Sequence, residues 1–125
     1  MIESALFAAK SQLNLNTSQQ KAWDQAVADT KAAREKGRAN AQTLRTLMQQ
    51  QLASTAPLDL AALATAGDQV QQQNQALRVS VRNEWIAVYN SFDDSQKAVV
   101  KQIVTQRMAR MQDMRQRFQQ RQQGG

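Results

Sequence analysis

Apolar residues recur every three or four positions along almost the whole chain, and this period predicts α-helices. In the first segment the spacing joins Ile2, Leu6, Ala9 and Leu13, and the run from Asn14 to Asn16 interrupts it. We therefore expect a short amphipathic helix ahead of this interruption.

Two much longer segments of the same period follow. The first begins at Thr17 and ends near Ala53. Its apolar stripe reads Trp23, Val27, Thr30, Gly37, Ala41, Leu44, Met48 and Leu52. Pro57 cannot lie inside a helix but suits the first turn of the next one, so the second is expected from about Pro57 to Asn90. Its stripe reads Leu63, Val70, Leu77, Val81, Trp85 and Val88, with the polar Asn74 at a core-type position.

The last segment predicts a basic helix from about Asp94 to Arg121. Its larger apolar residues, on or near one side, are Val100, Val104, Met108, Met111, Met114 and Phe118. Residues 122–125, which end in Gly124 and Gly125, are expected to form a frayed tail.

Composition supports an all-α fold with a thin core. Of 125 residues, one is Pro, four are Gly and only six are aromatic, while Ala and Gln are abundant. These are helix-favouring residues of small apolar bulk. We therefore expect a single domain over residues 1–125. It should be an elongated helical hairpin of about four helices, two of them very long, with apolar surface that a second copy completes in a homodimer.

Residue types that the chain lacks exclude several kinds of chemistry. Without Cys or His there are no disulfides, no thiol or imidazole catalysis and no common zinc site. Asp24, Glu84, Asp93 and Asp94 have no nucleophile or base beside them, so we interpret them as caps and surface charges. We expect no enzyme, no cofactor and no metal. No apolar run approaches the roughly 20 residues of a membrane span.

Charge is unevenly distributed along the chain. The net charge is +6, yet residues 1–96 carry nine basic and nine acidic residues. The whole excess therefore lies from Lys97 onward, where Asp113 is the one acid among seven Lys and Arg. Such a basic helix fits a solvated face, an acidic or unfolded polypeptide, or a phosphate backbone.

One short pattern occurs twice, as LNTSQ at residues 15–19 and FDDSQ at residues 92–96. Asn16 and Asp93 are strong N-cap residues, and each is followed three positions later by a Gln, Gln19 or Gln96. This spacing is typical of a capping box, in which the side chain of each residue accepts a hydrogen bond from the backbone N–H of the other. Each pattern therefore predicts the start of a long helix.

The two patterns resemble the LTxxQ motifs of small periplasmic, stress-induced chaperones of the Spy and CpxP type. Leu15, Asn16 and Gln19 match one motif, and Phe92, Asp93 and Gln96 match the other; Asn and Asp replace Thr, and Phe replaces one Leu. The order and lengths of the helices are similar over nearly the whole chain. The resemblance implies a thin, curved homodimer whose two motifs lie near one another.

The resemblance also implies a function, namely binding of unfolded or partly folded client proteins on a concave surface without ATP. It implies a periplasmic location, with any export signal removed from this numbering. Residues that combine cations with adaptable apolar groups are the candidates for this surface. They are Arg34, Arg38, Leu44, Arg45, Leu47 and Met48 in the second segment, and Met108, Met111 and Arg115 in the last.

Alternatives remain open at the level of sequence. A metal-sensing or stress-signalling relative of the same superfamily would rely largely on His, which is absent. A basic helical nucleic-acid-binding protein would use the last helix, but no known binding motif accompanies it. Arg34 falls on an apolar stripe, so it is either paired with an acid such as Asp68 or it lines an open groove.

Overall fold

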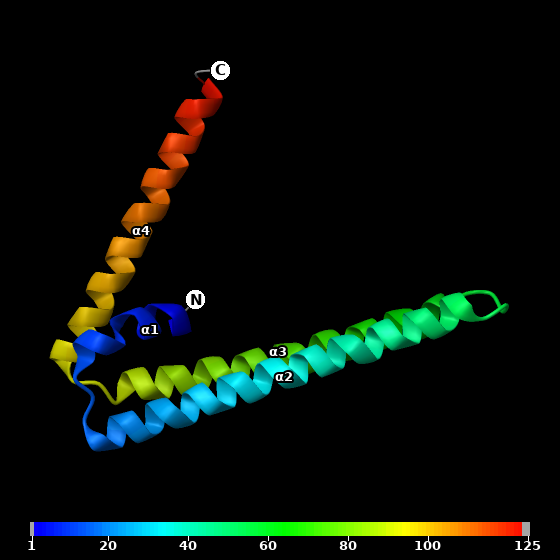
Figure 1. Ribbon diagram of the computed structural model, residues 1–125, viewed down its shortest axis with the longest axis horizontal. Helices are drawn as coiled ribbons and strands as arrows, with labels where there is room; N and C mark the ends of the chain where they lie inside the picture. The colour runs from blue at the N-terminus through cyan, green and yellow to red at the C-terminus, as the bar shows by residue number, and fades with distance from the viewer. Residues whose placement is uncertain (1, 124–125) are drawn as a thin grey trace.

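The computed structural model describes the backbone of residues 2–123 and the side chains of residues 3–122. It contains the helices α1 (Ile2–Leu13), α2 (Thr17–Ala53), α3 (Leu60–Asn90) and α4 (Asp94–Gln123), with no strand among the described residues. The all-α prediction is confirmed. Figure 1 shows a V: α2 and α3 form a long antiparallel hairpin, α4 diverges from it, and α1 lies in the corner between them.

Two helix boundaries differ by two or three residues from the predicted positions. The third helix begins at Leu60, because the Asp59 side chain accepts a hydrogen bond from Ala62 N at 3.0 Å and caps it; Pro57 remains in the loop. The Gln51 side chain closes this loop by accepting from Asp59 N at 2.9 Å. The last helix continues two residues past Arg121, to Gln123. The rest of the predicted tail, Gly124 and Gly125, lies outside the described residues.

The hydrophobic core lies at the corner of the V. Its buried members are Leu6, Ala9, Leu13, Trp23, Ala26, Trp85, Val88, Phe92 and Val100. Three aromatic rings pack edge to face there, with centroid distances of 5.6 Å for Phe7–Trp23, 5.2 Å for Phe7–Trp85 and 4.9 Å for Trp23–Trp85. Because α1 is short, it covers only this end of the hairpin.

Away from the corner both arms of the V are thinly packed. On α2 the predicted apolar stripe is buried only at Trp23 and Thr30, and at its far end Leu52 is 70% exposed. On α4 every described side chain beyond Arg107 is exposed. A pair of helices such as α2 and α3 leaves its side chains partly open to solvent, and the single helix α4 leaves them fully open. Burial therefore decreases toward the ends of both arms.

Candidate functional site

The two LTxxQ-like motifs meet at the corner through the side-chain amides of their glutamines. Gln19 Nε2 donates to Gln96 Oε1 at 2.9 Å, and Gln96 Nε2 donates to Gln19 Oε1 at 3.0 Å. Both side chains are buried, although 77 residues separate them in the chain. The expectation that the motifs lie near one another is therefore confirmed.

Each glutamine also completes a capping box. Gln19 N donates to Asn16 Oδ1 at 2.8 Å while Gln19 Oε1 accepts from Asn16 N, and Gln96 is joined to Asp93 in the same way. The remaining amide hydrogens reach backbone carbonyls across the interface. Gln19 Nε2 donates to Ser91 O, and Gln96 Nε2 donates to Leu13 O, both at 3.0 Å. Each glutamine amide thus uses both of its N–H donors and both lone pairs of its oxygen, so no hydrogen-bonding capacity is left unsatisfied.

The apolar residue ahead of each cap anchors the helix start to the core. Phe92 is buried in the core, and Leu15 packs against it while half-buried. Between α1 and the first box, Asn14 adopts a positive φ of 50°. Asn tolerates this left-handed conformation better than most residues, so it lets the chain reverse between α1 and α2.

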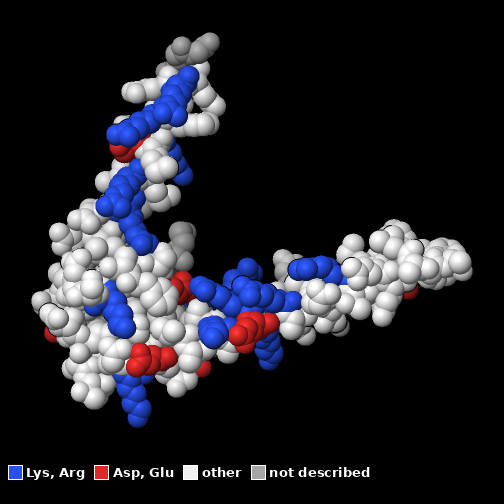
Figure 2. Space-filling model, in the orientation of Figure 1, with Lys and Arg blue, Asp and Glu red and all other residues white. Residues whose placement is uncertain are grey.

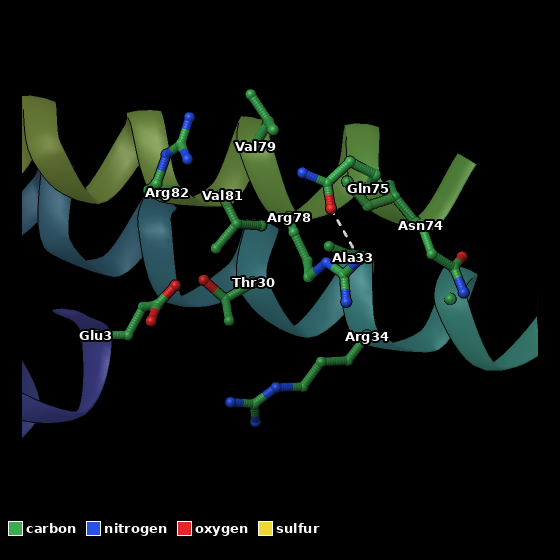
Figure 3. Close-up of a pocket in the computed structure, with 12 residues that line it drawn as sticks. Glu3, Thr30, Ala33, Arg34, Asn74, Gln75, Arg78, Val79, Val81 and Arg82 are labelled. Carbon is green, nitrogen blue, oxygen red and sulfur yellow. Dashed lines mark hydrogen bonds between the residues drawn. The ribbon is translucent and has the colours of Figure 1, made fainter. Parts of the chain in front are cut away.

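A groove of about 610 Å³ opens along the hairpin where α1 begins. Ala33, Gly37, Leu77 and Val81 contribute to its floor, together with Thr30 and Asn74. Arginines border it from both helices: Arg34 from α2, Arg78 and Arg82 from α3 (Figure 3). Figure 2 shows positive charge gathered on this middle part of the hairpin and again along α4.

Of the two interpretations of Arg34, the open groove is the one that the structure supports. The Arg34 side chain is exposed, and no ion pair joins it to Asp68 within the described residues. Asp68 lies six residues nearer the loop than Asn74, which is opposite Gly37. Burial raises the pKa of Glu3, but the hydrogen bond from its own backbone and nearby positive charge, including Arg34, outweigh this and leave the pKa below its ordinary value.

The sequence-predicted binding residues fall on two separate arms. Arg34, Arg38, Arg45 and Met48 are exposed on α2, while Leu44 and Leu47 are half-buried and line a second groove between α2 and α3. Met108, Met111 and Arg115 are exposed on α4, which diverges from α2 (Figure 1). The fold therefore gathers the α2 residues along one arm and holds the α4 residues apart from them.

Two carboxyl groups face each other across the hairpin near the core. Burial, a hydrogen bond with Asp29 and the negative charge of Asp29 together raise the pKa of Glu84 to about 7. Asp29 also accepts from Gln25 Nε2 at 3.0 Å. The four acids that sequence analysis grouped do not form one site. Among the described residues, no group of three or more Asp or Glu could hold a metal ion.

The raised pKa of Glu84 predicts that stability falls as pH rises. The folded state holds this proton more tightly than the unfolded chain, whose carboxyl has a pKa of about 4.5. The contribution is thus fully present below pH 4.5 and is lost as pH rises through about 7. Glu84→Gln should therefore stabilise the protein at pH 8 and raise its melting temperature there. The gain in the free energy of unfolding should be at most about 1 kcal/mol, because the pair is partly exposed to solvent. At pH 5 the same substitution should change the melting temperature little. The exposed Glu35→Gln is the control; an equal, pH-dependent gain there would contradict the assignment.

Sequence reasoning missed several residues that shape the corner and the groove. Phe7 closes the aromatic cluster, and Lys97 lies 5.5 Å from the Tyr89 ring centroid in a cation–π contact. Arg78 and Arg82 are spaced four residues apart, one helical turn, and that spacing was a signal that they share a face. Nothing in the sequence placed them opposite Arg34.

Comparison with known proteins gives one match. The family model described as "LTXXQ motif family protein" matches residues 2–104, most of the chain. No curated protein and no solved structure shows significant similarity. Among the described residues 2–123, none of the helices has the length and the hydrophobicity of a membrane span. Since the match covers α1 to α3, both motifs and the first third of α4, the chain belongs to the LTXXQ motif family.

Proposed function

We propose that this protein is an ATP-independent holdase of the periplasm, which binds unfolded or partly folded proteins and suppresses their aggregation. The observation that carries the proposal is the exposure of adaptable apolar side chains beside cations on both arms of the V. On α4, Met108 and Met111 are 55% and 54% exposed near Arg115, and on α2 Met48 is 45% exposed near Arg45.

Two physical steps would give such a surface its activity. Cations attract a client over a range of about 10 Å at moderate salt. Methionine and leucine side chains then provide short-range, non-directional affinity that tolerates many client sequences. Added salt should therefore slow capture of the client more than it weakens the final complex.

The proposal includes a homodimer. Monomeric soluble proteins rarely leave long apolar strips uncovered, yet Met108 to Phe118 on α4 and Leu52 to Leu60 at the hairpin tip are largely exposed. A second copy that covers Met114, Phe118 and the hairpin tip would leave Met108 and Met111 open to clients. Solution scattering with mass determination tests this, and a monomer at micromolar concentration would contradict it.

The test of function is light scattering from a chemically denatured client diluted into buffer. Met108→Gln/Met111→Gln should raise the amount needed for half suppression by about tenfold, because losing two partly buried apolar contacts costs about 1.4 kcal/mol. Gln112→Ala/Gln116→Ala, which truncates two exposed polar side chains of the same helix, is the control and should leave suppression unchanged.

Two outcomes would count against the holdase. The first is no suppression by the wild-type protein at a few-fold molar excess. The second is submicromolar binding of random oligonucleotides at physiological salt, with a steep salt dependence from counterion release, which would favour nucleic-acid binding by the basic α4 instead.

A further inference from the structure

Three arginines border the groove in the middle of the hairpin, one from α2 and two from α3. The register of the hairpin is fixed by Asn40 Nδ2, which donates to Asn74 Oδ1 at 2.9 Å. This register brings Arg34 of α2 opposite Arg78 of α3, with Arg82 one turn further toward the corner. In Figure 3 the Arg78 side chain reaches from α3 over the middle of the groove, between the other two.

Positive charge exceeds negative charge in the lining of this groove. Arg78 donates to a neutral partner, Gln75 Oε1 at 2.8 Å, and the negative charge of Glu3 acts on Arg34. Glu3 is the one acid in the lining, so the lining carries a net charge of +2. Like charges placed together destabilise a fold unless something between them offsets the repulsion.

The chemistry of the lining favours phosphate over a single carboxylate. Guanidinium groups are planar, always charged and able to donate two parallel hydrogen bonds to one phosphate. Three of them around one space suit a ligand with several closely spaced negative charges. Two further amides, those of Asn74 and Gln75, line the same groove and supply neutral hydrogen-bonding groups.

We propose that the groove between α2 and α3 binds a ligand with clustered phosphate groups through Arg34, Arg78 and Arg82. The ligand is either a free oligophosphate or the phosphate headgroup of a lipid, which share this chemistry. The site is a property of one chain, needs no client and stands independently of the holdase.

Titration calorimetry of the full chain with inorganic tripolyphosphate tests the proposal. The triple variant Arg34→Gln/Arg78→Gln/Arg82→Gln should weaken binding by about tenfold or more, because it removes every charge-assisted hydrogen bond of the site. The control triple Arg110→Gln/Arg117→Gln/Arg121→Gln removes the same net charge from exposed positions on α4, and should leave the affinity within about twofold. All six arginines are exposed, and unchanged circular dichroism would confirm that both variants fold.

Two more probes identify the source of the phosphate. Binding to phosphatidylcholine vesicles that contain phosphatidic acid, lost in the groove variant alone, supports a lipid headgroup; tripolyphosphate binding with the same dependence supports the free anion. Equal loss in both triple variants, or no binding of either probe, would overturn the site. Tighter, groove-dependent binding of a poly-glutamate peptide would overturn the phosphate assignment in favour of an acidic polypeptide.

Discussion

Replacing Gln96 with alanine is expected to lower the free energy of unfolding by about 3 kcal/mol, far more than loss of an exposed glutamine. The substitution leaves three groups without their partner at the corner: the Gln19 amide, Leu13 O and Asp93 N. An unsatisfied buried polar group costs about 1–3 kcal/mol, and these losses are not independent. Urea unfolding followed by circular dichroism measures the effect.

A matched control and a double variant test whether the effect comes from the paired amides. Gln102→Ala removes the same side chain from an exposed position on α4, so it should change stability by no more than about 0.5 kcal/mol. Because the two amides satisfy each other, Gln19→Ala/Gln96→Ala should cost clearly less than the sum of the single changes. Strict additivity would contradict a paired amide.

The substitution Gln96→Glu distinguishes the loss of hydrogen-bond donors from the loss of side-chain volume. Glutamate is nearly isosteric with glutamine and keeps an oxygen at the place of Oε1, so it can still accept from Asp93 N. It loses the two donors that serve Leu13 O and Gln19 Oε1, and sets a negative charge against both oxygens. Gln96→Glu should therefore be about as damaging as Gln96→Ala at pH 7 and partly relieved at pH 4, where the carboxyl is protonated.

The local parts of this arrangement could be predicted from sequence because they span only three residues. The three-residue spacing alone indicates a capping box, both for Asn16 with Gln19 and for Asp93 with Gln96. The third helix shows the limit of such reasoning: Pro57 and Asp59 are both good helix starters, and the hydrogen bond from Ala62 N to Asp59 decides in favour of the later one. Neither signal alone distinguishes the two.

The groove could not be predicted because it depends on how two helices are aligned. Arg34 sits on an apolar stripe, which suggests burial, but α1 is too short to cover that part of the hairpin. Arg78 and Arg82 look like ordinary surface charges until the Asn40–Asn74 hydrogen bond sets the register. Sequence periodicity indicates which face of each helix is buried. It does not indicate which residue of the neighbouring helix lies opposite a given residue.

Replacing Trp85 with alanine is expected to cost about 4 kcal/mol, a large effect because the large side chain is fully buried. Its ring lies against Trp23 and Phe7, and its Nε1 donates to Thr30 Oγ1 at 2.9 Å. Ile86→Ala, at the next position and 38% exposed, should cost no more than about 1 kcal/mol. Thermal and urea unfolding of both variants would be compared.

The Trp85–Thr30 hydrogen bond can be separated from the packing of the ring. Thr30→Val keeps the volume but removes the acceptor, so Trp85 Nε1 is left buried and unpaired at a cost of about 1–3 kcal/mol. Once Trp85→Phe has removed that donor, Thr30→Val should cost less, since only the hydroxyl's own bond to Ala26 O remains to be lost. If Thr30→Val is equally costly in both backgrounds, the hydrogen bond contributes nothing to stability, and Trp85 joins α2 to α3 by packing alone.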